Sequence, residues 1–571
     1  MTTGMRKGLT SYGDADFSLF LRKAFIKAMG YSDDALGRPI VGITNTYSSF
    51  NPCHGNVPKL VEAAKRGIMM AGGLPMEFPT ISIHESFAHP TSMFLRNLMA
   101  IETEEMIRAQ PMDAVVLIGG CDKTIPAQLM AAASAGRPAI LLPVGPMLVG
   151  HHRGEVLGAC TDCRRLWARY RAGEIDEAEI EAVSGRLAPT AGTCMVMGTA
   201  STMACVAEAL GMALPGSASI PATHADRLRA AEAAGRRAVA LAETGPRPSE
   251  IMTPVAFRNA LVVLQALGGS TNGVIHLAAV AGRLGIRLDL DGFDRLGREV
   301  PVLVDLKPSG QHYMEHFHWA GGVPRLLREL ADLVEARAPT VAGTPLAGAI
   351  QAAEEVPGQT VIRPRANPLK AGGAIAVLKG SLAPDGAVIK QSAAAPGLLR
   401  HEGRAIVFDS VEDMMRRIDD DTLDIAATDV LVLRNAGPRG APGMPEAGYL
   451  PIPRKLARAG VKDMVRISDA RMSGTAFGTI VLHVTPEAAI GGPLALVETG
   501  DRIRLDVPAR RLDLLVGEDE LARRRAAWSP PAPPPEAERG YGALYLRSVL
   551  QADRGCDFDF CVPRGVRGSA P

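Results

Sequence analysis

Short apolar segments alternate with helical segments through the first two-thirds of this 571-residue chain. Residues 39–45, 113–120 and 137–144 are apolar runs of strand length. Helical patterns follow the first two of them, at 57–71 and 125–135. Because runs this apolar have no side to offer to water, they suit a parallel sheet that helices cover on both faces. The sequence therefore predicts a large N-terminal domain with a doubly wound α/β fold.

The character of the sequence changes near residue 360, where a proline-rich stretch at 361–368 is typical of a linker. Short strand-like segments separated by glycine turns follow it, and they predict a smaller, β-rich and barrel-like C-terminal domain. We therefore divide the chain into an α/β domain at 1–365 and a β-rich domain at 366–571. The other elements expected are helices at 201–210, 224–243, 272–284, 324–336 and 541–553, and strands at 374–378, 387–390, 405–408, 430–434 and 502–507.

Charge and composition narrow the classes of function. The 62 lysines and arginines nearly cancel the 61 acidic residues, so no basic field indicates binding to nucleic acid or to an anionic membrane. The first residues contain no apolar signal segment, and no apolar run has the length of a membrane span. We expect a cytoplasmic protein that binds a small-molecule substrate and has neither nucleic acid nor membrane as a partner. Its eight cysteines are then reduced, each either a buried apolar residue or a metal or redox group.

The segment 119–124 places Cys121, Asp122 and Lys123 where a predicted strand ends and a predicted helix begins. Parallel α/β sheets bind their ligands at this edge. Free amides at the start of a helix favour bound anions and lower the pKa of a thiol. Taken alone, the tripeptide fits a reactive cluster and a glycine turn with a surface ion pair equally well.

Two further cysteines occupy comparable loops. Cys53 follows the strand predicted at 39–45, and Cys194 lies in a glycine- and threonine-rich loop before the helix predicted at 201–210. Such loops converge in space in a doubly wound domain, and thiolates are the usual ligands of iron–sulfur clusters. Three thiolates without a fourth would leave one iron open to act as a Lewis acid. Buried, inert cysteines remain the alternative, because ligands this far apart in sequence are weaker evidence than a compact motif.

Two other patterns resemble metal sites but are incomplete. Cys160 and Cys163 form a Cys-x-x-Cys pair, which lacks the second pair of a four-ligand zinc site. His312 and His316 share one face of a helix, without the His-Glu-x-x-His order of a metalloprotease. We expect both patterns to be structural.

Two late loops carry polar groups on glycine-rich backbone. Glu446 lies in the segment 440–448, whose prolines exclude regular structure. Ser473 stands beside Gly474 in the segment 468–478, where backbone amides could activate a hydroxyl. Each loop alone is more often a turn than a catalytic site.

Together, these motifs resemble the dihydroxy-acid dehydratase/6-phosphogluconate dehydratase family. The resemblance extends over nearly the whole chain, so the joint pattern is specific although each segment alone is weak. The segments that carry it, in the order seen in the family, are 51–56 (NPCHGN), 120–123 (GCDK), 145–147 (GPM), 193–194 (TC), 267–272 (LGGSTN), 442–444 (PGM), 471–474 (RMSG) and 555–560 (GCDFDF).

The resemblance implies two metal cofactors and a base. Cys53, Cys121 and Cys194 would hold an iron–sulfur cluster, 2Fe–2S by preference and 4Fe–4S in some relatives. The implied Mg²⁺ ligands are Glu85, Asp122, Glu446 and Lys123, the last as a carbamate, which gives a hard cation an oxygen donor. Ser473 would be the base, with Thr475 close to it. The family also implies a homodimer or homotetramer.

The implied reaction removes water from a 2,3-dihydroxy carboxylic acid. Ser473 takes the proton from C2, the 3-hydroxyl leaves, and the resulting enol becomes a 2-keto acid. The segments 442–448 and 468–475 resemble the sugar-acid branch, such as arabinonate and xylonate dehydratases. We therefore favour an aldonic acid as substrate, with His84 or His312 available to bind its hydroxyls.

Two alternatives stay open at this point. One is the branched-chain biosynthetic dehydratase, which acts on 2,3-dihydroxy-3-methyl acids. The other is a non-enzymatic iron–sulfur sensor. Against the sensor, the chain carries Glu85, Asp122 and Glu446 for oxygen-donor chemistry that a redox centre does not need.

Overall fold

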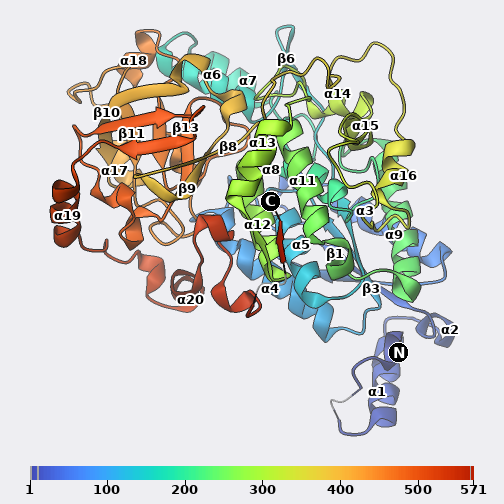
Figure 1. The fold of residues 1–571 in the computed structure, drawn as a ribbon. Coiled ribbons are helices and arrows are strands. Elements are labelled where there is room, and N and C mark those ends of the chain that lie inside the picture. The colour runs from blue at the N-terminus through green and yellow to red at the C-terminus, as the bar shows by residue number, and fades with distance from the viewer. Residues whose placement is uncertain (1–2, 10–11, 566–567, 571) are drawn as a thin grey trace.

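A computed structural model describes residues 3–9, 12–565 and 568–570 of the chain. Its N-terminal domain is built on a four-stranded parallel sheet with the strand order β2-β1-β3-β4 (Figure 1). Every residue of β3 is buried, as expected for a strand that helices cover on both faces. The strands are β1 (Ile40–Asn45), β2 (Leu74–Pro79), β3 (Ala114–Gly119) and β4 (Ala139–Pro143).

Helices cover both faces of this sheet. The chain passes from β1 outward to β2 and then back beyond β1 to β3 and β4. Right-handed crossovers therefore put α3 (Val57–Met70) on one face and α4 (Ser92–Ala109) and α5 (Thr124–Ala135) on the other. A later helix, α9 (Ala225–Thr244), packs along α3 and against the sheet. The predicted doubly wound α/β domain is confirmed.

A layer of buried helices packs behind α5. It contains α8 (Thr199–Ala209), α11 (Pro254–Ala266) and α12 (Asn272–Arg283). Every residue of α8 is buried. We did not predict α11, because a helix buried on nearly all sides has no polar stripe to give it an amphipathic period. The helix predicted at 324–336 is observed as the shorter helix α15 (Gly322–Glu329).

The C-terminal domain is a closed eight-stranded barrel with the order β10-β11-β12-β13-β9-β8-β15-β14. This confirms the β-rich, barrel-like prediction; the division at residues 365 and 366 stays a prediction. Closure removes the exposed sheet edges that an open sheet of this size would present. The strands are β8 (Ala376–Gly380), β9 (Ala383–Ile389), β10 (Arg400–Phe408), β11 (Val430–Leu433), β12 (Arg466–Ser468), β13 (Ile480–Thr485), β14 (Arg502–Asp506) and β15 (Arg511–Leu514).

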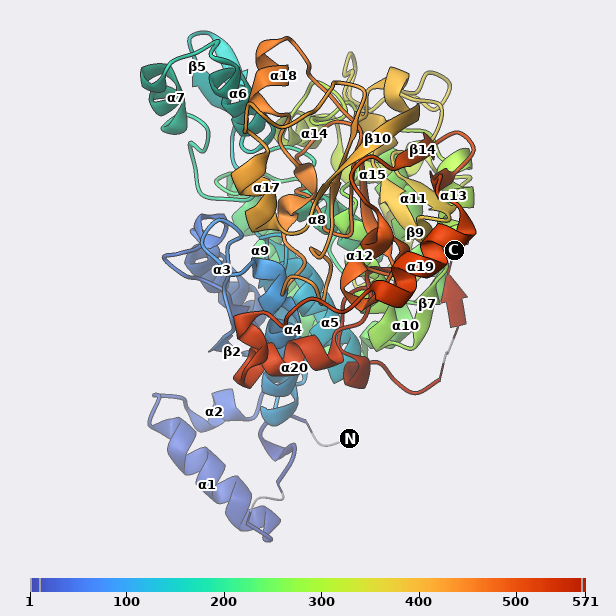
Figure 2. The same ribbon diagram turned by 90° about the vertical axis from the view of Figure 1, so that its left-hand side faces the viewer.

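The remaining elements surround these two units. In both views α1 and α2 stand away from the main body, and α20 lies beside α4 (Figures 1 and 2). None of the described helices is long and apolar enough to cross a membrane. The other helices are α1 (Ala15–Lys27), α2 (Asp33–Leu36), α6 (Thr161–Ala172), α7 (Glu177–Ser184), α10 (Pro248–Ile251), α13 (Leu290–Glu299), α14 (Met314–Trp319), α16 (Leu346–Gln351), α17 (Val411–Arg417), α18 (Arg454–Arg458), α19 (Glu518–Ala527) and α20 (Gly540–Ser548), and the short strands are β5 (Gly150–His152), β6 (Glu155–Leu157), β7 (Ile286–Leu288) and β16 (Gly568–Ala570).

Candidate active site

The strand order fixes where the first two cysteines meet. In the order β2-β1-β3-β4 the chain changes direction between β1 and β3, and parallel sheets bind ligands at the carboxyl ends of such neighbouring strands. Cys53 lies in the loop after β1, and Cys121 lies in the loop after β3. Both thiols are buried. The predicted convergence of these two loops is therefore a consequence of the sheet topology.

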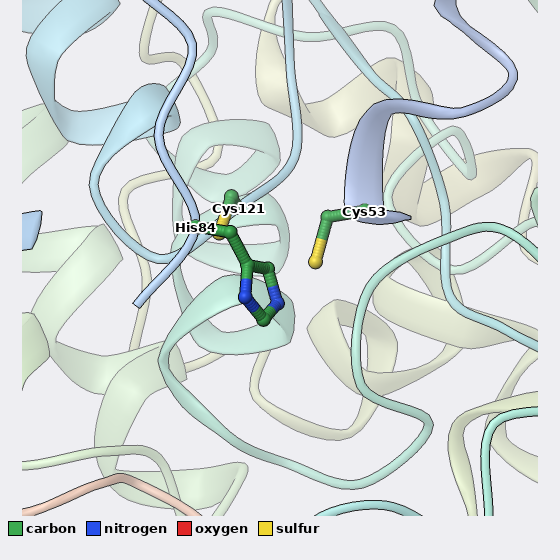
Figure 3. A group of neighbouring side chains, drawn as sticks. All are labelled: Cys53, His84 and Cys121. Carbon is green, nitrogen blue, oxygen red and sulfur yellow. The ribbon is translucent and has the colours of Figure 1, made fainter. Parts of the chain in front are cut away.

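His84 completes a compact group with these two thiols. One ligand atom from each of Cys53, His84 and Cys121 lies within 4.8 Å of the other two (Figure 3). His84 comes from the loop between β2 and α4. Asn51 ties that loop to the Cys53 loop, because its side-chain amide donates to the backbone oxygen of Ile83 at 3.2 Å. These residues could hold a metal.

The buried ring of His54 positions the Cys121 loop. Its Nε2 accepts hydrogen bonds from the amides of Gly120 and Cys121, each at 3.1 Å. Its Nδ1 lies 2.8 Å from the Thr46 carbonyl oxygen, to which it donates. Burial lowers the pKa of His54 to about 4, so the ring is neutral and keeps this pattern at neutral pH. Sequence reasoning gave this histidine no role.

Cys194 lies at the same edge of the sheet but is paired with a different thiol. Thr193 pairs with Pro146 in a parallel bridge just beyond β4, which brings the Cys194 loop to the ends of the strands. The Sγ atoms of Cys194 and Cys160 are 3.3 Å apart. The Cys160 thiol, burial and the Cys53 thiol raise the pKa of Cys194, so Cys194 also lies within electrostatic range of Cys53.

A cluster of carboxylates lies next to the thiols. Glu85 Oε1 accepts a hydrogen bond from Thr91 Oγ1 at 2.5 Å and from Arg471 Nη2 at 2.9 Å. The other guanidinium nitrogen, Arg471 Nη1, donates to Glu446 Oε1 at 2.5 Å. Lys123 Nζ lies 3.6 Å from Glu85 Oε2 and 3.7 Å from Asp122 Oδ2. All four residues predicted to bind Mg²⁺, Glu85, Asp122, Lys123 and Glu446, therefore lie in one cluster that Arg471 holds together.

The barrel contributes Glu446 through a close approach to α4. Gly443 has a φ of +82°, and a Cβ there would overlap the Thr91 side chain and approach the Phe94 amide to 2.6 Å. Only glycine fits this backbone and this gap without strain. The loop can therefore lie against the start of α4, where Glu85 is bound.

Burial and charge shift the pKa values of Glu85 and Glu446 in opposite directions. Burial alone would raise the pKa of Glu85, but the positive charges of Arg471 and Lys123 outweigh it and lower that pKa. Burial raises the pKa of Glu446 to about 7, although the Arg471 charge opposes it. Two carboxyl groups that share one guanidinium thus hold their protons with very different strength, which is typical of a functional site.

Ser473 lies in the loop between β12 and β13 and faces the N-terminal domain. Its Oγ is 2.8 Å from Thr475 Oγ1 and accepts from the Thr475 amide at 3.4 Å. Thr161 donates to the Thr475 carbonyl at 2.9 Å, and the Asn272 amide donates to the Met472 carbonyl at 3.0 Å. The loop is therefore fixed from both sides by residues of the other domain.

A buried lysine contacts the same loop. Lys390 Nζ donates to the Gly474 carbonyl oxygen at 3.3 Å, and burial lowers the pKa of Lys390 to about 7. Sequence reasoning did not find this residue, because a lysine at the end of a predicted strand gives no signal by itself. His312, by contrast, belongs to the turn before α14, where its ring lies 5.5 Å from that of His316.

Comparison with family models decides the relationship. Residues 38–349 match the N-terminal model of dihydroxy-acid/6-phosphogluconate dehydratases, and residues 360–556 match the C-terminal model. The chain belongs to this dehydratase family. The resemblance drawn from its motifs is therefore confirmed.

Several similar proteins of the family are sugar-acid dehydratases by name. The chain is 50% identical to an L-arabonate dehydratase of Azospirillum brasilense, over 98% of this chain and 97% of the relative. It is 48% identical to an L-arabinonate dehydratase of Rhizobium leguminosarum bv. trifolii, over 98% and 96% of the two chains. It is 46% identical to a 6-deoxy-6-sulfo-D-gluconate dehydratase of Pseudomonas putida, over 92% and 91%.

For this family member, the structure brings together nearly all the residues singled out from the sequence. The thiols of Cys53 and Cys121, the carboxylate cluster and the Ser473 loop lie at the junction of the sheet and the barrel. The roles predicted for these residues stay predictions. Sequence reasoning missed His54, Arg471 and Cys160. The first two lie inside motifs that we quoted, so their positions were visible but their contacts were not.

Proposed function

We propose that this protein dehydrates a sugar acid such as L-arabinonate to a 2-keto-3-deoxy acid. The observation that carries the proposal is the segment 121–123, in which one loop joins a buried thiol group to a carboxylate cluster. Family membership supports the reaction class, and the L-arabinonate and L-arabonate dehydratases among its relatives support the substrate.

The residues fit the two cofactors that the family resemblance implies. Cys53, Cys121 and Cys194 are free thiols at one edge of the sheet and would hold an iron–sulfur cluster, by preference 2Fe–2S. Glu85, Asp122 and Glu446 offer oxygen atoms, the donors that Mg²⁺ prefers. When bound, the cluster would supply a Lewis acid for the hydroxyl that leaves, and Mg²⁺ on the substrate's oxygens would make the C2 proton more acidic.

The surroundings of Lys123 support the carbamate that the family resemblance implies for this residue. Its side chain is buried, and its Nζ has no hydrogen-bond partner among the described residues. Glu85 and Asp122 balance its charge from 3.6 and 3.7 Å, but a buried ammonium that makes no hydrogen bond is still costly. A carbamate at Nζ would replace that positive charge with oxygen ligands, which together with the neighbouring carboxylates would suit Mg²⁺, and the cation would offset their negative charge. Carbon-13 NMR of the folded protein equilibrated with 13C-bicarbonate, which detects a carbamate carbon in place, tests this directly.

Ser473 is the residue best placed to move the C2 proton. An alkoxide at its Oγ would keep two hydrogen-bond donors, the Thr475 hydroxyl at 2.8 Å and the Thr475 amide at 3.4 Å. Hydrogen bonds to the charged form favour it. The Arg471 guanidinium acts in the same direction, and so does Lys390 in its protonated form. Because Ser473 is largely buried, these interactions are screened little by water.

Turnover on a panel of acids tests the proposal. Protein purified without oxygen is given L-arabinonate, D-xylonate, D-gluconate and 2,3-dihydroxyisovalerate, and the release of 2-keto acid is measured. We expect the highest kcat/KM on a pentonic acid and a loss of activity with a magnesium chelator that added Mg²⁺ restores. A preference for 2,3-dihydroxyisovalerate would favour the branched-chain enzyme. Iron-containing protein that converts none of the four would favour the sensor.

The same proposal includes a homo-oligomer, either a dimer or a tetramer. Helix α1 supports it, because Phe17, Phe20 and Phe25 expose 47%, 64% and 74% of their surface on a helix that stands away from the body. Exposed apolar patches of this kind mark interaction sites. Light scattering during gel filtration measures the mass, and a monomer at micromolar concentration would contradict this part.

A further inference from the structure

A fourth thiol lies beside the three cysteines of the proposed cluster site. Cys160 Sγ is 3.3 Å from Cys194 Sγ, and all eight cysteines are free thiols within the described part of the chain. Cys160 belongs to the loop that precedes α6, and nothing in the proposed function uses it. Its sequence pattern, Cys-x-x-Cys with Cys163, indicated a zinc or redox pair rather than a place at this site.

The four thiols form two pairs. Cys53 and Cys121 belong to the compact group with His84, whereas Cys160 pairs with Cys194. The described residues contain no other group of three metal-ligating side chains within 4.8 Å, so the second pair does not merge with the first. A single ion needs all its ligand atoms close together, because each lies about 2.3 Å from the metal. Two separate pairs instead suit a cluster of two irons, which takes two thiolates at each end.

The Cys160 loop is held by a buried polar network. Asp162 Oδ2 accepts from the Gly158 amide at 2.8 Å and from the Tyr313 hydroxyl at 2.9 Å. Lys307 Nζ donates to Asp162 Oδ1 at 3.0 Å. The Asp162 side chain is 1% exposed. Satisfied buried networks rigidify the segments they join, so the position of the thiol beside Cys194 is a built feature of the loop.

Cys160 also lines a cleft that does not reach the other three cysteines of the site. This cleft of about 820 Å³ opens between α6 and the segments around α18 and β12 of the C-terminal domain. Cys160, Cys163, Tyr449 and Phe477 are among the residues that line it. Cys53, Cys121 and Cys194 are not among its lining residues. A small oxidant that entered the cleft would therefore meet Cys160 before it met Cys194.

We propose that Cys160 is a fourth thiolate ligand of the cluster in the substrate-free protein and covers the edge of the cluster that faces this cleft. The inference rests on the proposed function, which supplies the cluster. On ligation the S–H bond breaks, the proton passes to water and a sulfur–iron bond forms, with no change of oxidation state. Substrate that takes this position releases Cys160, which recovers a proton from water.

Cys160→Ser and Cys561→Ser form a matched pair of variants, because both residues are partly exposed free thiols and only Cys160 lies beside Cys194. After purification without oxygen, we measure iron per chain, the visible absorption and the electron paramagnetic resonance of the reduced cluster. We expect Cys160→Ser to keep iron on the other three cysteines but to show a shifted spectrum. Its cluster should bleach in air about tenfold faster, in line with the loss of a metal-site partner. Cys561→Ser should match the wild type in spectrum and in air half-life.

A spectrum and an air half-life of Cys160→Ser equal to those of the wild type would overturn the proposal. Alkylation of the wild-type protein gives a measurement that does not depend on how a variant folds. Cys160 should resist iodoacetamide in the iron-loaded protein and react after a chelator removes the iron, while Cys561 reacts equally in both. Equal labelling of Cys160 in the two forms would contradict the proposal alone. Wild-type protein that holds no iron would contradict the proposed function instead.

Discussion

Replacing Ser473 by alanine separates catalysis from stability, because the change removes one hydroxyl from a buried site. The side chain loses its 2.8 Å hydrogen bond with Thr475, which costs about 1 kcal/mol. That loss lowers Tm by about 2–4 °C in a domain of this size. Proton transfer by a positioned base contributes about 10²- to 10⁴-fold to the rate. We therefore expect kcat to fall at least about 100-fold, with KM little changed.

The assay follows 2-keto acid release from L-arabinonate, together with iron content and Tm. Ser392→Ala is a matched control, because Ser392 is also a buried serine whose Oγ lies 2.7 Å from another hydroxyl, that of Ser309. The control should lose similar stability and keep its activity. If Ser473→Ala retained more than a third of the wild-type kcat, or lost activity only in step with its iron, Ser473 would not be the base.

Three further changes probe the framework of the site. Gly120→Ala places a Cβ against the Val144 side chain, so we expect the free energy of unfolding to fall by about 1–3 kcal/mol and iron binding to be lost. Gly185→Ala, which has open space around it, should change neither the unfolding nor the iron assay. Asp557→Ala removes the carboxylate that the buried Arg283 guanidinium contacts at 2.5 and 3.0 Å and leaves it Glu104 at 3.1 Å, so unfolding should cost about 1.5–3 kcal/mol less. The exposed Asp559→Ala is its control. Burial raises the pKa of Glu208 from 4.5 to about 7, so between these pH values the folded protein binds more protons than the unfolded one, and its stability falls as pH rises. Relative to the wild type, Glu208→Gln should therefore gain about 3 kcal/mol of stability between pH 5 and pH 8. A difference in stability that does not change with pH would refute this.

The parts of the fold that the sequence predicted are those with local signals. Strands β1, β3 and β4 are continuous apolar runs, α3 carries a clear amphipathic period, and α5 has the composition of a helix. Strand β12 has three residues and includes the buried Arg466, so neither its length nor its pattern distinguishes it from a turn. It exists because β11 and β13 pair with it on either side, which is tertiary information.

The candidate site also divides into contacts that the sequence predicted and contacts that it did not. The loops of Cys53 and Cys121 could be placed together because strand ends in a parallel sheet converge. Arg471 could not be matched with Glu85, because 386 residues separate them and only the docking of the barrel brings them together. Cys160 was missed for a related reason: its Cys-x-x-Cys spacing suggested a self-contained pair, while the Asp162 network turns the thiol toward Cys194.

The position of Cys121, Asp122 and Lys123 explains how one loop serves two chemistries. The three residues form the turn that precedes α5, and a turn directs successive side chains to different partners. Cys121 lies beside Cys53, while Lys123 Nζ lies among the carboxylates. The barrel then closes the site through Arg471 and Ser473, whose loop is bound to Asn272 and Thr161. The distance between the proposed base and the proposed cofactor sites is therefore set by the contact between the domains, so we expect residues of that contact to affect turnover without touching the substrate.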